Sequence, residues 1–424
     1  MRVAVIGAGS TYTPELVSGL ARERERLGVT ELALHDVDAE RLEVVGGLAG
    51  RMLERDGFEG RLIETGDLDR ALDGASFVLI QIRVGGQAAR LLDETVPLAC
   101  GCIGQETTGA GGLAKALRTV PVVLEIAERA RERAASDAWI VDFTNPVGIV
   151  TRALLDAGHR AVGLCNVSIG FQRDLARRLG VEPERVLVDN VGLNHLTWVR
   201  SVRVDGEDVL PDLLAEHGDE LAAEARLPRR FLDELGVIPS YYLHYFYAHD
   251  EVLAEQRDGV PRARRVMEIE RELLEMYRDP ALAEKPALLE QRGGAFYSEA
   301  AIGLAASLAG GTGEVHVVDT RNDGTLAGLA DDDVVEVPAR VGRDGPEPLP
   351  QRPLAPELLG LVQHVAAYER LAADAAVTGD VVTVRKALLA HPLIGQHEYA
   401  SELAERLLSV GAEHLPQFAK EVTA

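Results

Sequence analysis

Residues 2–12 read RVAVIGAGSTY, an apolar, β-branched run that is followed at once by a glycine-rich turn. The run Arg2–Ile6 predicts a buried strand. Gly7 and Gly9 then supply a tight turn and a close approach of the backbone to a pyrophosphate at a helix N-terminus. Tyr12 stands where the third glycine of this fingerprint is usual. The stretch predicts the first strand, turn and helix of a dinucleotide-binding sheet; a glycine turn in a sheet that binds no nucleotide is the alternative.

A second expected strand, Glu31–Asp36, ends in a carboxylate 27 residues beyond Gly9. A carboxylate at this place accepts hydrogen bonds from the ribose hydroxyls and repels a 2′-phosphate, so Asp36 favours NAD over NADP. The expected cofactor contacts lie in the turn, at this strand end and at the end of a later strand: Gly7, Gly9, Ser10, Thr11, Asp36 and Arg83.

The first 165 residues alternate short apolar runs with helical patterns, which is typical of a doubly wound parallel sheet. Helices are expected over Pro14–Arg26 and Asp38–Arg55, the second with Asp38 as its N-cap. The expected strands are Arg2–Ile6, Glu31–Asp36, Arg61–Thr65, Ser76–Ile82, Trp139–Phe143 and Ala161–Cys165. The predicted fold class is α/β, with a Rossmann-type sheet like that of lactate and malate dehydrogenases.

The pattern changes in the second half of the chain, where helical runs dominate. The expected strands are Val186–Val191 and Thr197–Val204, and the expected helices are Pro261–Tyr277, Pro356–Ala375 and Glu402–Val410. Asp319–Pro350 is rich in Asp, Gly and Pro, so we expect loops there with a short strand pair, of which Val334–Val337 is one member. We expect residues 1–165 to form an NAD-binding domain and 166–424 a mostly α-helical α+β domain for substrate binding and oligomerisation, with the boundary between 165 and 190.

The composition limits the classes of partner. The chain of 424 residues has 44 Lys and Arg against 68 Asp and Glu, a formal net charge of −24. Such a charge repels nucleic acid and anionic membranes. The chain has only four lysines, so a lysine base has few candidate positions. Three cysteines, no signal-peptide pattern and no long apolar run lead us to expect a cytoplasmic protein without membrane or nucleic-acid partners.

Two segments after the fourth expected strand combine arginines with glycines. Arg83–Arg90 reads RVGGQAAR, and Gly101–Gly112 reads GCIGQETTGAGG. Ligands of open α/β sheets bind at the carboxyl ends of the strands, and guanidinium groups grip phosphate or carboxylate. These segments therefore predict a site for an anionic or polyhydroxylated ligand; a surface loop with solvated arginines is the alternative.

Cys165 and His195 lie at or just after the ends of predicted strands. A thiolate and an imidazole at two strand ends can share one divalent metal and leave positions open for water and substrate. A buried structural cysteine and a structural histidine are the alternative. Four of the nine tyrosines fall within 241–247. A tyrosine acts as a base where a cation or metal lowers its pKa from about 10; aromatic packing is the alternative.

Seven ordered motifs together resemble glycoside hydrolase family 4 and, within it, the 6-phospho-β-glucosidases. The motifs are GAGSTYTPEL (7–16), QIRVGG (81–86) followed by Arg90 and Asp93-Glu94, IGQET (103–107), FTNP (143–146), GLCNV (163–167), GLNH (192–195) and IPSYYLHY (238–245). RGGAFYS (292–298) extends the resemblance into the second half of the chain.

The resemblance implies a hydrolase that depends on NAD and a divalent metal, typically Mn²⁺, in contrast to the two-carboxylate scheme of most glycosidases. NAD⁺ oxidises the C3 hydroxyl of the sugar, a tyrosine removes the acidified C2 proton, and the aglycone leaves by elimination. Water then adds and the C3 hydroxyl is restored by NADH. The metal bridges the C2 and C3 oxygens and stabilises the enediolate.

Roles for individual residues also follow from the resemblance. Cys165 and His195 match the metal ligands, and Tyr242 matches the base, with Tyr241 as its rival. The expected contacts to the sugar and its phosphate are Arg90, Glu106, Asn145, Asn166 and Arg292. Arg90 and Arg292 are the candidates for the phosphate.

Other functions stay open at this point. His244 stands where the family often has arginine, which keeps an unphosphorylated sugar possible, whereas Asn166 in place of aspartate argues against an α-linked one. An NAD-dependent 2-hydroxy-acid dehydrogenase would need a pattern such as His-Gly-Asp, but Leu196 follows His195. A catalytically silent NAD-binding regulator is disfavoured by the joint presence of the expected metal ligands and base. We expect a homodimer or homotetramer.

Overall fold

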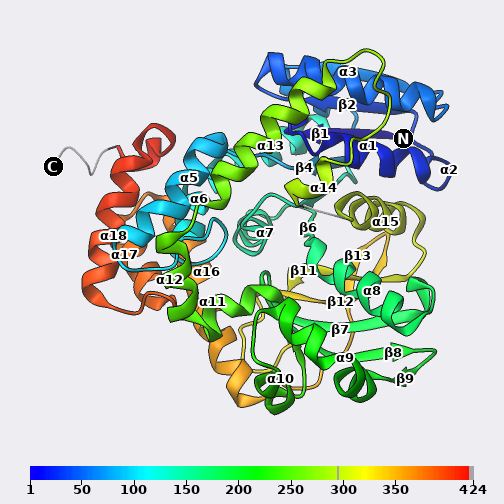
Figure 1. The fold of residues 1–424 in the computed structure, drawn as a ribbon. Coiled ribbons are helices and arrows are strands. Elements are labelled where there is room, and N and C mark those ends of the chain that lie inside the picture. The colour runs from blue at the N-terminus through cyan, green and yellow to red at the C-terminus, as the bar shows by residue number, and fades with distance from the viewer. Residues whose placement is uncertain (294–295, 420–424) are drawn as a thin grey trace.

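The computed structural model describes residues 1–293 and 296–419. Its first half is a sheet of six parallel strands in the order β3-β2-β1-β4-β5-β6, with helices on both faces (Figure 1). The strands are β1 (Arg2–Ile6), β2 (Glu31–His35), β3 (Arg61–Thr65), β4 (Phe77–Ile80), β5 (Trp139–Asp142) and β6 (Ala161–Gly163). The expected Rossmann-type sheet is confirmed, and each strand lies within the apolar run that predicted it.

Alternate residues of these strands supply two hydrophobic cores, because successive side chains of a strand point to opposite faces. Val3 and Val5 pack in one core, and Ala4 and Ile6 pack in the other. A fully buried Val or Ile contributes about 2 kcal/mol. The first core is covered by α1 (Thr13–Arg22), α3 (Ala39–Arg55), α13 (Arg262–Tyr277) and α15 (Tyr297–Gly310). The second is covered by α6 (Gly109–Arg133), α7 (Val147–Asp156) and α16 (Pro356–Thr378).

Two expected helices of the first half have different outcomes. Helix α3 begins as predicted, with the Asp38 carboxylate accepting from the Arg41 N–H at 3.0 Å. The single helix expected over Pro14–Arg26 is instead α1 followed by the short α2 (Arg24–Leu27). The chain breaks at Glu23 because the run RERER (22–26) has no apolar residue to continue the buried face.

Antiparallel strands of the second half continue the same sheet, which has 13 strands in all within the described residues. They are β7 (Val186–Leu193), β8 (Leu196–Val204), β9 (Glu207–Asp208), β10 (Ile238–Pro239), β11 (Glu314–Arg321), β12 (Val334–Gly342) and β13 (Gly345–Pro348). Strands β11 and β12 pair along eight residues and lie between β6 and β7. Each outer junction of this hairpin has a single paired position, Asp319 with Gly163 and Glu336 with Gly192.

The expectation of a loop-rich Asp319–Pro350 was therefore incomplete. The expected strand Val334–Val337 is present, but it extends to Gly342 and is joined by β11 and β13. Asp319 and Glu336 are almost fully buried in these strands, a placement that composition alone predicts poorly because buried carboxylates are rare.

The remaining helices pack against the sheet or against other helices. They are α4 (Leu68–Leu72), α5 (Gly86–Ala99), α8 (Asn166–Leu179), α9 (Leu210–Ala225), α10 (Arg229–Leu235), α11 (His244–Tyr247), α12 (His249–Asp258), α14 (Leu289–Arg292), α17 (Val381–Ala390) and α18 (His397–Val410), with a short 3₁₀ turn, η2, at Tyr241–Leu243. Helix α17, for example, packs on α16 and α18. Pro356 is the first residue of α16, as predicted, whereas Pro261 is the N-cap of α13. Helix α18 begins five residues before the expected Glu402.

Over the described ranges 1–293 and 296–419, none of the helices combines the length and the apolar character that crossing a bilayer requires.

Candidate active site

A cavity of about 1900 Å³ runs along the carboxyl edge of the parallel strands. Its lining includes residues of the glycine turn, the ends of β2 and β4, the loop before α6, the start of α8, the β7–β8 turn and η2. Typical cavities for small ligands measure about 300–1,000 Å³, so this one has room for more than one ligand. The sugar and cofactor residues expected from the sequence are thus brought to one place, with the exceptions described below.

The glycine turn is held tightly against the neighbouring strands. The backbone N–H groups of Gly7 and Ala8 both donate to the carbonyl oxygen of His35, at 2.9 and 2.8 Å. Gly7 has φ +91°, and a Cβ there would lie 2.8 Å from the carbonyl oxygen of Gln81. Gly9 and Ser10 line the cavity, whereas Thr11 is fully buried and does not line it. The placement of Thr11 does not support the expected cofactor contact by its side chain.

Asp36 lies where the sequence placed it, at the end of β2 and in the cavity wall. Its carboxylate accepts from the backbone N–H of Gly9 at 2.7 Å and from that of Asp38 at 3.0 Å. A Cβ on Gly9 would lie 2.8 Å from the Asp36 carboxyl carbon. The missing side chain of Gly9 therefore allows the carboxylate to approach the turn.

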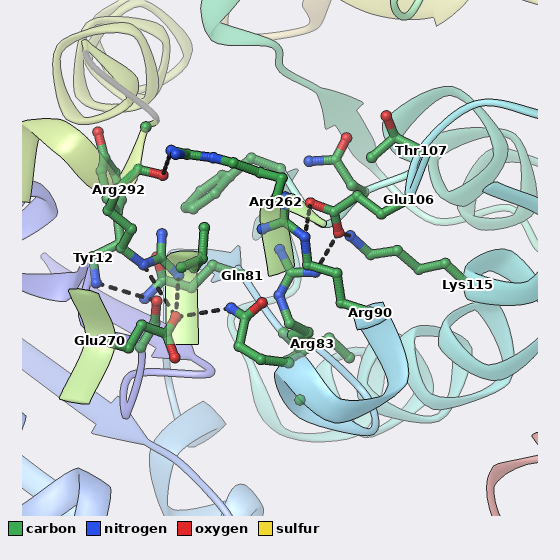
Figure 2. Close-up of a pocket in the computed structure, with 18 of the residues that line it drawn as sticks. Tyr12, Gln81, Arg83, Arg90, Glu106, Thr107, Lys115, Arg262, Glu270 and Arg292 are labelled. Carbon is green, nitrogen blue, oxygen red and sulfur yellow. Dashed lines mark hydrogen bonds and ion pairs between the residues drawn. The ribbon is translucent and has the colours of Figure 1, made fainter. Parts of the chain in front are cut away.

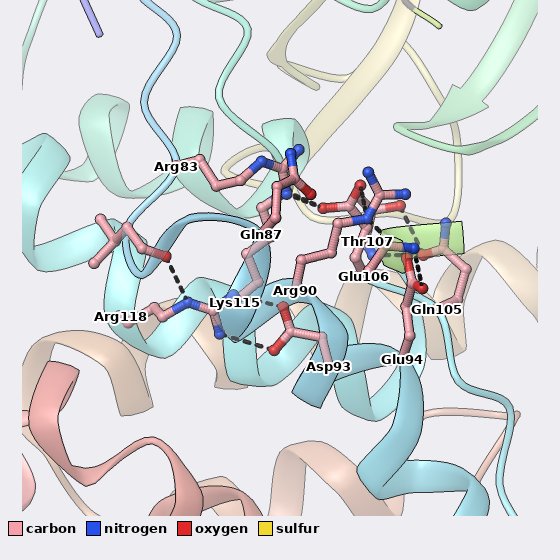
Figure 3. A network of polar contacts seen from close by, with 12 residues as sticks. Arg83, Gln87, Arg90, Asp93, Glu94, Gln105, Glu106, Thr107, Lys115 and Arg118 are labelled. Carbon is pink, nitrogen blue, oxygen red and sulfur yellow. Dashed lines mark hydrogen bonds and ion pairs between the residues drawn. The ribbon is translucent and has the colours of Figure 1, made fainter. Parts of the chain in front are cut away.

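Three cations surround the carboxylate of Glu106 (Figure 3). Arg83 and Lys115 pair with Oε2, the lysine at 2.7 Å, and the Nε of Arg90 lies 3.2 Å from Oε1. Burial alone would raise the pKa of Glu106, but these three cations outweigh it and hold the pKa well below the usual range. Glu106 is therefore ionised and holds Arg83, Arg90 and Lys115 in place.

Lys115 is a functional candidate that the sequence analysis missed. It is 2% exposed, lines the cavity from α6, and is one of only four lysines in the chain. Burial, followed by the positive charge of Arg83, lowers its pKa to about 7. The local sequence AKALR looks like an ordinary amphipathic helix. The signal lies in the pairing with Glu106, nine residues earlier, which only the fold brings together.

A buried ion pair between Arg118 and Asp93 lies beside this cluster. Arg118 donates to both carboxylate oxygens of Asp93, at 2.8 and 2.5 Å, and to the carbonyl oxygen of Val84 at 3.0 Å (Figure 3). Glu94 accepts from Arg90 at 2.7 Å and from the Ala263 N–H at the start of α13 at 2.7 Å. Helix α5 and the Arg83 loop are thereby fixed to α6 and α13.

A second carboxylate, Glu270 of α13, organises the other side of the cavity (Figure 2). Its Oε1 accepts from Arg292 at 3.1 and 3.2 Å and from Gln87 at 2.9 Å. The guanidinium carbon of Arg292 also lies 5.7 Å from the ring centroid of Tyr12. Arg292 thus joins the wall formed by the glycine turn, and burial lowers its pKa despite the carboxylate.

The expected metal ligands lie on two strand ends that Asn194 connects. His195 is the second residue of the two-residue β7–β8 turn and has φ +62°. Its neighbour Asn194 hydrogen-bonds the thiol of Cys165 and donates to Glu336 at 3.1 Å. Left-handed backbone at a residue with a side chain is strained and is typical of functional sites.

The His195 imidazole and the Cys165 thiol have different electrostatic surroundings. Burial, with the charge of Lys115, lowers the pKa of His195 to about 3, so the imidazole is neutral, as a metal ligand must be. Its Nδ1 lies 2.9 Å from Thr107 Oγ1. Burial and the nearby carboxylate of Glu336 raise the pKa of the Cys165 thiol. Among the described residues, no three His, Cys, Asp or Glu side chains form a metal site, so two protein ligands would leave positions open.

The remaining candidates line the same cavity. The ring of Tyr242 stacks on that of His195, with centroids 3.8 Å apart. Asn166 lies at the first turn of α8. The side-chain oxygen of Asn145 is buried without a hydrogen-bond partner in the protein, which is unusual and fits a ligand hydroxyl. Tyr241 also lines the cavity and is 43% exposed.

The fold and this site define an enzyme with a Rossmann-type sheet and a large cavity in which charged and aromatic side chains lie beside a glycine turn. Residues 2–181 match the model of the family 4 glycosyl hydrolases, and residues 190–394 match the model of their C-terminal domain. The chain belongs to glycosyl hydrolase family 4.

Relatives are similar over almost their full length. A Bacillus subtilis (strain 168) protein described as a probable 6-phospho-beta-glucosidase is 41% identical, covering 100% of this chain and 99% of the relative. The structure of the 6-phospho-beta glucosidase from Thermotoga maritima with NAD and glucose-6-phosphate has 37% identity and a TM-score of 0.91, covering 98% and 99%. A form with manganese, NAD+ and glucose-6-phosphate has 36% identity, the same TM-score and the same coverage. A lactate dehydrogenase, with 14% identity and a TM-score of 0.54 over 89% and 98% of the two chains, shares the fold alone.

Proposed function

We propose that this enzyme hydrolyses 6-phospho-β-glucosides with NAD and a divalent metal, Mn²⁺ being the metal named for a relative. The observation that carries the proposal is the joint lining of one cavity by the glycine turn, the cations around Glu106 and the His195–Tyr242 stack. These three features suit a dinucleotide, an anionic sugar and proton abstraction, respectively.

The glycine turn fits NAD. Gly7 and Gly9 let the turn pack directly against Gln81 and Asp36, where a Cβ would clash, and Asp36 lines the cavity as an acceptor for ribose hydroxyls. Ser10 lines the cavity at the turn, and Arg83, which pairs with Glu106, lies between the cofactor and the sugar in this proposal. When bound, NAD supplies a hydride acceptor for the C3 position of the sugar and returns the hydride later.

Cys165 and His195 fit a divalent first-row metal, because a neutral imidazole and a thiolate are both ligands for such metals. A metal there would polarise sugar oxygens. The thiol must lose its proton to bind, and Asn194 donating to the sulfur favours that form.

The protein residues have distinct tasks around the sugar. Arg90 and Arg292 hold the phosphate, and Glu106 fixes Arg90 in place. Asn145 accepts from a sugar hydroxyl through its unpartnered oxygen, and Asn166 contacts the ring. Tyr242 takes the proton from C2 once the neighbouring carbonyl has made it acidic, and the stacked His195 holds the phenol in position.

A 2-hydroxy-acid dehydrogenase is not favoured. The dehydrogenase match is to the fold alone, whereas the two Thermotoga maritima structures with glucose-6-phosphate match 98% of this chain at 36–37% identity. The relatives named as 6-phospho-alpha-glucosidases have lower identity, 24–25% among the solved structures, than the 6-phospho-beta-glucosidases. Both observations support the β-linked, phosphorylated substrate.

Incubation with nitrophenyl 6-phospho-β-glucoside, NAD⁺, Mn²⁺ and reductant tests the proposal. We expect release of nitrophenol without net accumulation of NADH, because the hydride is returned in each cycle. Stoichiometric NADH from a hydroxy acid would contradict it.

Arg90→Gln should weaken binding of glucose 6-phosphate by at least about tenfold and leave glucose binding unchanged, since one charged hydrogen bond to phosphate is lost. Arg264→Gln, an exposed change on α13, is the control.

The domain boundary, the oligomeric state and the cellular location are also part of the proposal. We place the domain boundary at 165–190, with residues 1–165 binding NAD and 166–424 carrying substrate residues. We propose a homodimer or homotetramer, which sedimentation would test. We also propose a cytoplasmic location, where NAD and phosphorylated sugars are available.

A further inference from the structure

The cavity extends beyond the residues to which the proposed function gives roles. The cofactor takes the end at Asp36 and the glycine turn, and the phosphorylated sugar takes the middle at Arg90, Glu106 and Tyr242. A third region of the wall comes from α8, α9, η2 and α12. A leaving group attached at C1 of the sugar needs space that neither the cofactor nor the phosphate occupies, and this region supplies it.

The chemistry of this third region differs from that of the middle. Its wall combines the aromatic side chains of Phe171 and Tyr241 with the carboxylates of Asp174, Glu224 and Glu255. Among the lining residues of these four elements there is no lysine or arginine, whereas Arg83, Arg90, Lys115 and Arg292 line the middle. The cavity therefore changes from cationic to acidic along its length.

The cations that balance these carboxylates lie behind the wall. Arg178 of α8 has a side chain that is 4% exposed and pairs with Asp174, Glu220 and Glu224. Arg178 does not line the cavity. Asp174 and Glu224 are thus held by a buried guanidinium, whereas Glu255 pairs with the more exposed Arg226, which does not line the cavity either. The remaining acceptor sites of these carboxylates face the cavity or solvent.

Glu220 and Glu224 form a natural comparison. They lie one turn apart on α9, both pair with Arg178, and their side chains are 65% and 55% exposed. Glu224 lines the cavity and Glu220 does not. A substitution at either position removes the same kind of ion pair, but only the change at Glu224 alters the cavity wall.

We propose that the α8–α9 end of the cavity is the leaving-group subsite and that Glu224 determines its specificity. Glu224 favours an uncharged, polyhydroxylated leaving group, such as a second sugar ring, and disfavours an anionic leaving group. The inference rests on the proposed function. Aromatic surfaces pack against the apolar face of a sugar ring, and the carboxylate of Glu224 accepts hydrogen bonds from its hydroxyls. The same negative charge repels a carboxylate on the leaving group.

Three substrates test the subsite. The first is methyl 6-phospho-β-glucoside, the second is cellobiose phosphorylated at O6 of its non-reducing ring, and the third is the same disaccharide with C6 of the reducing ring oxidised to a carboxylate. The two disaccharides have the same shape and linkage, so the ratio of their kcat/KM values reports the charge preference. We expect the wild-type enzyme to favour the neutral disaccharide by at least about fivefold, the effect of one nearby, solvent-screened charge.

Glu224→Gln should reduce the preference for the neutral disaccharide to less than about twofold, whereas Glu220→Gln should keep the preference of the wild type. Both variants should bind glucose 6-phosphate as the wild type does. Equal cleavage of the two disaccharides by the wild type, or equal narrowing in both variants, overturns the inference and leaves the proposed function intact if methyl 6-phospho-β-glucoside is cleaved. Cleavage of none of the three substrates overturns the proposed function and this inference together.

Discussion

The imidazole of His195 lies flat against the phenol ring of Tyr242, with ring centroids 3.8 Å apart and an interplanar angle of 10°. The two residues come from different elements, the β7–β8 turn and η2. The stack holds the proposed metal ligand and the proposed base in a fixed relation. A change at one of these side chains is therefore expected to affect the other, which double-mutant cycles can measure.

Tyr242→Phe should keep the stack and remove the base. We expect deuterium exchange from solvent into C2 of the sugar, and turnover with it, to fall by about 10²–10⁴-fold, the usual contribution of a general base. NAD affinity should stay unchanged. Tyr241→Phe is the matched control from the same turn; if it abolished exchange and Tyr242→Phe did not, the base would be Tyr241.

Cys165→Ser should lower the affinity for Mn²⁺ by at least about tenfold, because the hydroxyl is a poorer ligand than the thiolate. Titration of free Mn²⁺ by electron paramagnetic resonance measures this directly. Cys102→Ser is the control, since Cys102 is also buried but lies in the loop between α5 and α6, whereas Cys165 is the N-cap of α8. Unchanged Mn²⁺ affinity in Cys165→Ser would refute the metal site.

Gly9→Ala should weaken NAD binding by at least about tenfold. The added Cβ would lie 2.8 Å from the Asp36 carboxyl carbon and 3.0 Å from the Arg41 Cβ, so the turn must shift away from β2. Quenching of protein fluorescence on NAD addition gives the affinity. Gly360→Ala in α16, where a Cβ meets nothing within 4 Å, should bind NAD like the wild type. Equal affinities for all three proteins would count against the turn as the pyrophosphate site.

Lys115 should make stability rise with pH above neutrality. Its pKa is lowered by burial from 10.5 to about 7 in the folded state, so between these values the unfolded chain binds more protons than the folded one. The free energy of unfolding therefore increases from about pH 7 to about pH 10.5.

Lys115→Met removes this contribution. The slope of the free energy of unfolding against pH should fall, relative to the wild type, by up to about 1.4 kcal/mol per pH unit. Urea unfolding at several pH values between 7.5 and 9.5 measures the slope. Parallel curves for the two proteins would show that Lys115 keeps an ordinary pKa in the fold. Lys386→Met, an exposed change on α17, should leave the slope unaltered.

The sequence predicted the parallel half of the sheet because its strands are short, apolar and separated by helical patterns. Arg2–Ile6 and Arg61–Thr65 have the expected bounds. It also placed Asp36 and His195 at the ends of strands that meet in the cavity. The prediction for Asp36 succeeds because neighbouring parallel strands end at one edge of the sheet, so local patterns suffice. His195 lies instead in the tight turn between the antiparallel strands β7 and β8, and its place in the cavity depends on how these strands continue the sheet.

The parts that the sequence did not predict depend on contacts between distant segments. Glu270 lies on α13, 183 residues beyond Gln87, to which it is hydrogen-bonded. Its charge among the polar residues of that helix gives no sign of burial, and the same holds for Lys115. Asp319 is fully buried although it belongs to a stretch rich in turn-forming residues. Tertiary packing overrides local pattern at such positions.

The hairpin of β11 and β12 is joined to β6 on one side and to β7 on the other by one paired position each. The glycine turn and Cys165 lie on the β6 side, whereas His195 and Tyr242 lie on the β7 side. The proposed site residues therefore lie on both sides of the β11–β12 hairpin, whose two junctions with the rest of the sheet have one paired position each. In the proposed function the cofactor lies on the β6 side and Tyr242 on the β7 side, so a shift at either junction would change the distance between the bound cofactor and this tyrosine.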